Sequence, residues 1–479
     1  MARRISRQPI ATLATALLIA LLAIGADQPL TLEQRAVLDH ISADSLRGHL
    51  SFIASDALEG RATPSRGLDL AAEYIAAQFR RAGLEPAGDD GYFQTASIIV
   101  REPNREGFAM TVKAGGRTTS IAANEAYIVP STPLNLDDAE LVIADGSQPL
   151  TADAINGKAV LLTTQRVRFP AGARPSLVLT LATTLPTRPA ALEPDSAPPA
   201  FPAGAILKPE LADFVRGASD VRITLHAAAA IQTPVNVRNV AGILRGSDPQ
   251  LRDTYVILSS HYDHLGMAST GADRIYNGAN DDGSGTSSVI EIASALAAMP
   301  VHPKRSVLFV LFFGEEMGLW GSHYYARHPL VPPAQTIAQL NLEQVGRTDD
   351  SEGPQVRTAT ITGYDFSDLP GILADAGKAT GIRVYKHPKN SDAYFGRSDN
   401  QSLADLGIPA HTLSVAFEFP DYHRVSDSWD KIDYENMAAV DCAVALGLLR
   451  LTSDEAPPKW NDQYAPARRY VEAGRRLHP

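Results

Sequence analysis

Residues 254–285, TYVILSSHYDHLGMASTGADRIYNGANDDGSG, carry the pattern that decides the fold. The stretch begins with the uninterrupted apolar run YVIL, which is typical of a strand buried on both faces of a sheet. The run leads into His261 and Asp263. About twenty residues later, Asp281 and Asp282 open a segment whose apolar residues recur at helical spacing. Because ligands of an α/β sheet bind beyond the carboxyl ends of its strands, these side chains predict a metal site there.

Carboxylates also follow two further apolar runs. The run 306–313 leads into Glu315 and Glu316, and the run 337–342 leads into Glu343. Carboxylates at the ends of neighbouring strands repel one another and raise one another's pKa. They can share one place only with cations among them, so the pattern itself predicts bound metal. Acids in the first turn of a helix are favoured without metal, which explains one such residue but not the whole set.

The adjacent glutamates are the most specific local signal. One carboxylate of such a pair can bind a metal while its neighbour takes a proton from the attacking water. His261 supplies an imidazole ligand, and Asp263 is expected to accept the other ring N–H and so to set the tautomer. His423 supplies the second imidazole that a site with two metals would use.

Three other reactive side chains are not assigned to the site. His264 lies past the turn that follows the first strand. Ser284 lacks the G-x-S-x-G frame of a nucleophilic serine. Cys442, the one cysteine, lies in the apolar run 440–449 and is interpreted as a small buried residue without a disulfide partner in the chain.

The composition of the chain bounds its class and its partners. The 479 residues suffice for two or three domains. Lys and Arg number 43 against 54 Asp and Glu, and the net charge of −11 disfavours a nucleic-acid or anionic-membrane partner. Residues 1–26 read as a signal peptide, with basic residues before an apolar stretch that is too short to span a bilayer. We therefore expect export to a bacterial periplasm or to the outside, with no membrane association after cleavage.

The rest of the chain divides by composition. From about residue 236 to residue 451 strands alternate with helices, which is the mark of an α/β sheet covered on both faces. From about residue 120 to residue 240, short apolar strands alternate with turns, and prolines cluster. This pattern predicts an inserted β-rich accessory domain, with a long disordered linker as the alternative. The expected parts are a first catalytic segment, the insert, a second catalytic segment and a polar C-terminal tail, at 27–118, 119–240, 241–455 and 456–479.

Six stretches of the chain resemble the di-zinc aminopeptidases of the bacterial leucyl aminopeptidase type. This zinc exopeptidase family also includes glutamate carboxypeptidase II. The resemblance covers most of residues 44–450, and it implies a mixed, mostly parallel central sheet with helices on both faces. It also identifies the insert as a protease-associated-like domain. The stretches are SSHYDHLG, YNGANDDGSG, FFGEEMGLWGSHYY, NLEQVGR, GRSDNQSLADLGIPA and YHRVSDSWDKID.

The resemblance also implies a role for each matching residue. Two zinc ions per chain are expected, one held by His261 and Glu343 and the other by Glu316 and His423, with Asp281 bridging them. Many members of the family carry Asp at the place of Glu343. By the same resemblance, Glu315 would be the general base, and Asp263 would be the hydrogen-bonding partner of His261. Tyr422 would donate a hydrogen bond to the oxyanion.

The implied activity is removal of N-terminal residues from peptides with a free N-terminus. Two alternatives stay open. The first is cyclisation of N-terminal glutaminyl residues, an acyl transfer that a similar fold performs with one zinc. The second is a non-catalytic peptide-binding relative, which is disfavoured because every ligand position keeps a metal-binding side chain. The side-chain preference, the native metal, the oligomeric state and the purpose of the insert are left open by the sequence.

Overall fold

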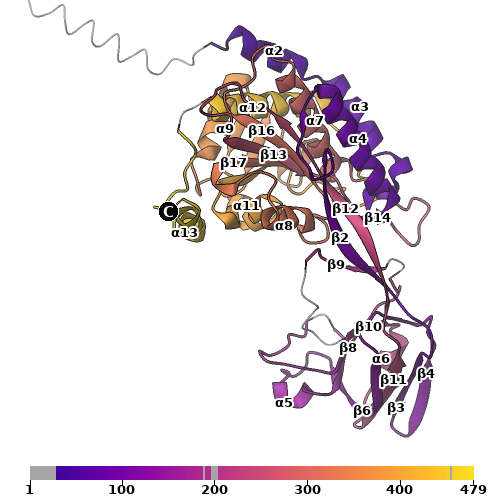
Figure 1. Cartoon of the computed structure of the whole chain (residues 1–479). Coiled ribbons are helices and arrows are strands. Elements are labelled where there is room, and N and C mark those ends of the chain that lie inside the picture. Colours follow the sequence, from indigo (N-terminus) through magenta and orange to yellow (C-terminus); the bar gives the residue numbers. More distant parts are fainter. Residues whose placement is uncertain (1–28, 165, 187–188, 196–202, 454–455, 479) are drawn as a thin grey trace, which may run out of the picture.

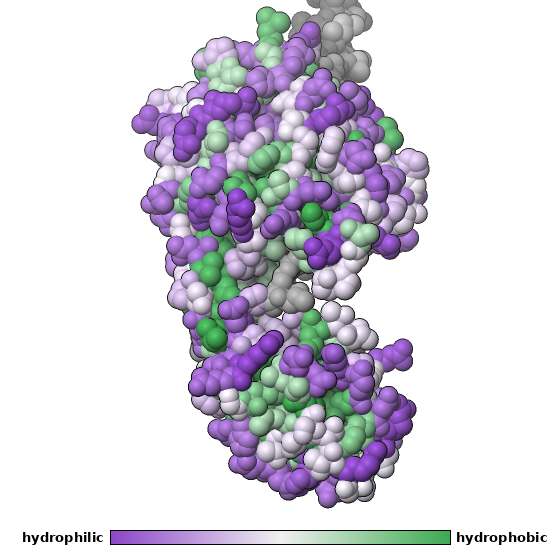
Figure 2. Space-filling model, turned by 90° about the vertical axis from the view of Figure 1, so that its right-hand side faces the viewer, coloured by the Kyte–Doolittle hydropathy of each residue, from purple (hydrophilic) through white to green (hydrophobic). Residues whose placement is uncertain are grey.

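The computed structural model describes residues 29–164, 166–186, 189–195, 203–453 and 456–478. The predicted signal peptide therefore lies outside the described residues. The described residues form two lobes (Figure 1). The large lobe holds a sheet between layers of helices, and the small lobe is rich in strands. The long strands β2 (Phe93–Glu102) and β12 (Ile231–Leu244) run between them. The space-filling view shows the same division as an indentation between two masses (Figure 2).

The sheet of the large lobe has ten strands. Its centre is parallel: β13 pairs with β16 and with β17, and β17 pairs with β22. Both flanks are antiparallel through β12, β2 and β20, apart from the parallel outer pair β20–β21. The predicted mixed α/β fold is confirmed. In order across the sheet the strands are β21 (Arg383–Tyr385), β20 (Thr358–Ile361), β22 (Ala410–Ser414), β17 (Thr336–Leu342), β13 (Tyr255–His261), β16 (Ser306–Phe312), β12, β2 and β9 (Ala190–Leu192), with β1 (Glu85–Pro86) beside β12.

The central strands are buried on both faces, as their unbroken apolar runs predict. Every residue of β13 and of β16 is buried. Successive side chains of a strand point to opposite faces, so Val256 and Leu258 enter one apolar cluster while Tyr255 and Ile257 enter another. Each cluster is then closed by its own layer of helices. One layer holds α2 (Leu32–His40), α3 (Ala43–Ile53), α4 (Arg66–Ala82), α7 (Gly285–Ala297), α9 (Leu369–Thr380) and α12 (Tyr434–Ser453), and the other holds α8 (Trp320–Arg327), α11 (Asn400–Leu406) and α13 (Arg468–Leu477).

Helix α12 is a core helix. It is the one helix of the described residues whose length and composition would suit a membrane span, yet 78% of that apolar window is buried inside the protein. Cys442 of this helix is half-buried and unpaired with another cysteine. The helix packs mainly on α9, α3 and α2, so its apolar surface is used within the fold.

The small lobe has a sheet and an apolar core of its own. The predicted insert began at residue 119 and ended at 240, whereas the strands of this sheet run from Ala109 to Ala227 and β12 belongs to the main sheet. Its identity as a protease-associated-like domain stays a prediction. Its strands, in order across the sheet, are β4 (Arg117–Ile121), β3 (Ala109–Ala114), β11 (Val221–Ala227), β6 (Leu134–Ala144), β7 (Ala159–Leu162), β8 (Leu177–Leu181), β10 (Ala203–Leu207) and β5 (Ala126–Ile128), with the short helices α5 (Ala152–Ile155) and α6 (Glu210–Val215).

Candidate metal centre

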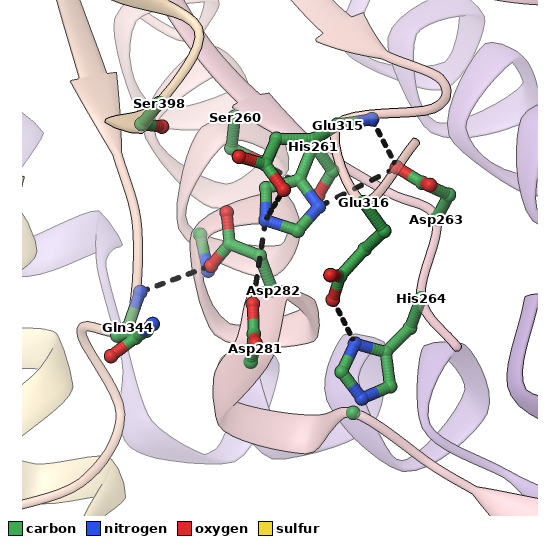
Figure 3. A network of polar contacts seen from close by, with 12 residues as sticks. Ser260, His261, Asp263, His264, Asp281, Asp282, Glu315, Glu316, Gln344 and Ser398 are labelled. Carbon is green, nitrogen blue, oxygen red and sulfur yellow. Dashed lines mark hydrogen bonds and ion pairs between the residues drawn. The ribbon is translucent and has the colours of Figure 1, made fainter. Parts of the chain in front are cut away.

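The predicted ligands meet at one edge of the central sheet. His261 is the last residue of β13, and the glutamates that follow β16 and β17 leave their strands at the same edge. Asp281 reaches this place from the turn 279–284 that precedes α7, and His423 from the loop after β22. Parallel strands thus deliver their carboxyl-terminal side chains to a common place, as Figure 3 shows for most of them.

A first group of possible ligands consists of His261, Asp281 and Glu343. One ligand atom from each lies within 4.8 Å of the others. His261 Nε2 is 3.4 Å from Asp281 Oδ1, and His261 Nδ1 is 3.5 Å from Asp263 Oδ1 (Figure 3). Asp263 therefore lies behind the histidine, where it can fix the ring orientation.

A second group consists of His264, Asp281 and Glu316, again with ligand atoms within 4.8 Å of one another. His264 Nδ1 is 2.7 Å from Glu316 Oε1. His423 Nε2 approaches the same place, 3.2 Å from Asp281 Oδ2 and 3.3 Å from Glu316 Oε2. His264 was not predicted to belong to the site, but its backbone N–H donates to the Arg61 carbonyl at 3.1 Å, and its ring lies beside Glu316. Asp281 is common to both groups.

The two groups fit divalent cations. In the part of the chain that the structure describes, seven buried or half-buried ligand atoms of these residues have no hydrogen-bond partner. These atoms lie near oppositely charged groups but make no well-formed hydrogen bond, which is costly for buried polar atoms. Imidazole nitrogens with carboxylate oxygens are ligands that zinc prefers. These atoms are both ring nitrogens of His261 and of His264, Asp281 Oδ2, Glu316 Oε1 and His423 Nε2.

The charges of the site are strongly coupled. Burial raises the pKa of Glu343 to about 7, although the His261 charge opposes the rise. Burial alone would raise the pKa of Asp281, but the imidazoles of His261 and His423 beside it lower that pKa below its ordinary value. Burial would lower the pKa of His423, but the nearby carboxylates of Asp281 and Glu316 raise it to about 10. The acids thus favour positive charge among them, which is the role a metal ion would take.

Glu315 lies beside the first group without belonging to it. Its Oε2 is 4.0 Å from His261 Nε2, and its backbone N–H donates to Asp263 Oδ1 over 3.0 Å. Burial raises the pKa of Glu315 well above its ordinary value. Its carboxylate also lines the cavity over the site, so it has access to a bound molecule.

A cavity of about 550 Å³ opens over the two groups. Asp281, Glu315 and Glu343 line its floor, and Tyr422 lines its wall. The Tyr422 ring stacks on the His423 ring with centroids 3.9 Å apart, and 44% of the tyrosine is exposed. The structure thus brings every residue assigned to the site from the sequence to this cavity or to its immediate surroundings.

Two buried residues that hold the ligand loops in place, Arg61 and Asp427, were not predicted from the sequence. Arg61 is fully buried, and it donates hydrogen bonds to the carbonyls of Ile53, Tyr262, Asn277 and Gly278. Two of these acceptors lie in the turn before Asp281, and Tyr262 follows the first histidine. Burial lowers the pKa of Arg61 to about 10, while the nearby acids oppose the fall.

Asp427 is the second of these buried residues. Its carboxylate accepts hydrogen bonds from the backbone N–H groups of Asn280 and Asp281, at 3.0 and 3.1 Å. Asn280 Oδ1 in turn accepts from the N–H groups of Gly346 and Arg347, both at 2.9 Å. The loops that carry Asp281, Glu343 and His423 are thereby tied together. Asp427 lies in the quoted stretch YHRVSDSWDKID, but nothing in that stretch marks it as buried.

Comparison with known proteins supports the family resemblance and the fold. Residues 239–446 match the sequence model of peptidase family M28. Aminopeptidase YwaD of Bacillus subtilis is 34% identical over 228 residues, which cover 46% of each chain. A probable zinc metalloprotease of Pyrenophora teres f. teres is 32% identical over 120 residues, or 25% of each chain. The chain thus spans between about a quarter and a half of the length of these curated relatives.

Solved structures show the fold over a longer stretch. An aminopeptidase from Aneurinibacillus sp. strain AM-1 superposes with a TM-score of 0.58 at 20% identity, over 88% of this chain and 97% of that one. A zinc aminopeptidase of Bacillus subtilis gives a TM-score of 0.56 at 20% identity, over 87% and 96%. The predicted resemblance to zinc aminopeptidases is confirmed.

Proposed function

We propose that this chain, whose residues 239–446 match the sequence model of peptidase family M28, is an exported zinc aminopeptidase that removes N-terminal residues from peptides. One observation carries the proposal. Two groups of histidine and carboxylate ligands share Asp281, and the carboxylate of Glu315 lies beside them at the floor of a cavity. A general base outside the ligand set and next to it is what hydrolysis of a peptide bond requires.

The residues of the two groups indicate which side chains would bind each zinc ion. His261, Glu343 and Asp281 would hold one zinc ion, and Asp281, Glu316 and His423 the other, with His264 close to the second place. When bound, two zinc ions polarise the scissile carbonyl and make the attacking water more acidic.

The chain's own residues move the protons. Glu315 takes a proton from the water as its oxygen bonds to the scissile carbonyl carbon. The carbon–nitrogen bond then breaks, and Glu315 gives the proton to the leaving amine. Asp263 holds both partners in place, because it lies against His261 Nδ1 and accepts the backbone N–H of Glu315. Tyr422 lines the cavity wall, and its hydroxyl group would donate to the oxyanion.

Replacement of Glu315 by Gln tests the proposal. The variant should keep its zinc content and lose turnover of aminoacyl 4-nitroanilides by about 10²–10⁴-fold, because the amide cannot take the proton. Glu106→Gln, at an exposed position in the small lobe, is the matched control and should keep full activity. Undiminished turnover in the Glu315→Gln variant would contradict the assigned role.

The products separate hydrolysis from the alternative acyl transfer. An aminopeptidase releases a free amino acid from each peptide, whereas glutaminyl cyclisation releases ammonia and leaves the peptide chain intact. Metal analysis of the mature protein is the companion measurement. Two zinc ions per chain are expected here, and one zinc ion with ammonia release would support the cyclotransferase instead.

A further inference from the structure

Two arginines face the cavity over the metal centre, and their role rests on the proposed function. We propose that Arg397 and Arg424 form a carboxylate-binding subsite, so that the preferred peptides carry a carboxylate close to the scissile bond. Both line the same cavity as Asp281, Glu315 and Glu343. Arg397 precedes α11, and Arg424 directly follows His423. The subsite therefore adjoins the reacting centre from two different segments.

The cavity suits the end of a short peptide. Its volume of about 550 Å³ lies within the ~300–1,000 Å³ of typical small-molecule sites. Tyr394, Phe417 and Phe419 supply aromatic walls, and charged groups are few among the wall residues. A substrate group that enters this space meets the two guanidinium groups within the cavity.

Both guanidinium groups lack a carboxylate partner. No carboxylate among the described ranges of the chain lies within 4.0 Å of either one. Other cations nearby are paired: Arg347 binds Asp349 and Asp421, and Lys431 also binds Asp421. The two arginines of the cavity thus differ from their neighbours in offering unused donors.

The one acid of the cavity wall is already engaged. Glu418 Oε1 accepts the Tyr394 hydroxyl group at 3.2 Å, and Oε2 accepts the Ser351 hydroxyl group at 3.0 Å. The floor acids belong to the metal centre, where bound ions would offset their charge. Glu418 keeps its negative charge, but the two arginines outnumber it, so the walls are positive on balance and favour an anionic ligand.

Arg397 is held in a suitable orientation. Its Cζ atom lies 4.4 Å from the centre of the Tyr394 ring, and Phe417 packs edge-on against that ring at 5.2 Å. A guanidinium group stacked on a ring keeps its planar edge free. That edge matches a carboxylate through two parallel hydrogen bonds, the strongest pairing available to arginine. The carboxylate comes either from the C-terminus of a dipeptide or from an acidic side chain.

Two pairs of peptides distinguish these sources. The first pair is Leu-Leu and Leu-Leu-amide, and the second is Leu-Glu-amide and Leu-Gln-amide. We expect the zinc-loaded wild type to prefer the member with the carboxylate in at least one pair by about tenfold in kcat/KM, mainly through KM. Arg397→Gln and Arg424→Gln should each reduce this ratio toward one.

Arg383→Gln is the matched control. Arg383 is also exposed and stacks on a tyrosine, Tyr385, at 4.2 Å, but it does not line the cavity. This variant should keep the wild-type ratio. Equal kcat/KM values within both pairs, or a preference that survives both cavity substitutions, would overturn the subsite.

A binding measurement separates the subsite from the proposed function. Calorimetric titration of zinc-loaded Glu315→Gln with Leu-Leu, Leu-Leu-amide and the second pair needs no hydrolysis. Tighter binding of a carboxylate-bearing peptide that is lost with Arg397→Gln supports the subsite even if the wild type hydrolyses nothing. Hydrolysis of all four peptides without discrimination in either assay leaves the peptidase standing and removes the subsite.

Discussion

Asp427 accepts a hydrogen bond of 3.1 Å from the backbone N–H of Asp281, the residue shared by both ligand groups. The same carboxylate binds the N–H of Asn280 with both oxygens. Asp427 also follows His423 in one loop, so a single side chain sets the distance between two candidate ligands of the second group. The geometry of the centre therefore depends on a residue that would not bind metal itself.

Asp427→Asn should weaken zinc binding. The amide nitrogen of Asn cannot accept from a backbone N–H, so one side of the clamp is lost. Outer residues of this kind typically contribute about 10–100-fold in metal affinity. Dialysis against graded concentrations of a chelator, followed by metal analysis, measures the change. Asp430→Asn, at an exposed position of the same loop, is the control, and equal chelator resistance in the two variants would refute the clamp.

Arg61→Met should destabilise the folded protein. The substitution removes the donors to four carbonyl groups that are enclosed with it. Breaking a buried charged network typically costs about 3–5 kcal/mol of unfolding free energy. Arg61→Lys should retain only a part of the unfolding free energy that Arg61→Met loses, because an ammonium group cannot reach four separate acceptors. Urea denaturation of the metal-free protein, with exposed Arg66→Met as control, gives the difference.

The central strands could be predicted because burial on both faces leaves an unbroken apolar run in the sequence. The carboxyl ends of β13, β16 and β17 must then share one edge, and this is why His261, Glu315 and Glu343 could be grouped. The position of His264 could not be predicted in this way. Its backbone N–H donates to the backbone carbonyl of Arg61, which comes from a remote part of the chain, and the sequence does not reveal which remote segment will meet this turn.

The boundary of the small lobe could not be located for a different reason. Strand β12 is one continuous element, Ile231–Leu244, that leaves the small lobe and pairs with β2 along its length before it pairs with β16. A boundary at residue 240 falls inside this strand. The strand continues without interruption from one lobe into the other within a single hydrogen-bonded ladder. The sequence therefore contains no turn or break at which a boundary could be placed.

His411 should make stability depend on pH. The ring is fully buried, with Nδ1 2.8 Å from the Thr362 carbonyl and Nε2 2.6 Å from Ser367 Oγ. Burial lowers its pKa to about 4. The unfolded chain binds a proton below about pH 6.5, whereas the folded protein does so only below about pH 4. The contribution of His411 to the free energy of unfolding is thus fully present above pH 6.5, and up to about 3 kcal/mol of it is lost as the pH decreases to 4.

His411→Gln should remove this part of the pH dependence. The carboxylates of the metal centre also titrate in this range, so the informative quantity is the difference between the variant and the wild type. Urea denaturation at pH 7.5, 6 and 5 with metal removed provides it. Exposed His478→Gln serves as control, and parallel pH curves for His411→Gln and the wild type would exclude the effect.

Gly407→Ala should loosen the C-terminal helix α13. Gly407 has a φ of +97°, and a Cβ atom there would lie 2.3 Å from the backbone nitrogen of Gly474. The Gly407 carbonyl also accepts the Trp460 indole N–H at 2.8 Å, so this residue is a docking point for the tail. Gly381→Ala is the matched control, because Gly381 ends α9 with a φ of +77° and has nothing within 4 Å of the added atom. Both variants bear the conformational cost of alanine at positive φ, about 1 kcal/mol, and only the first bears the clash, about 1–3 kcal/mol more. Faster proteolysis of residues 456–478 in Gly407→Ala than in Gly381→Ala is expected, and equal rates would mean that α13 does not depend on this contact.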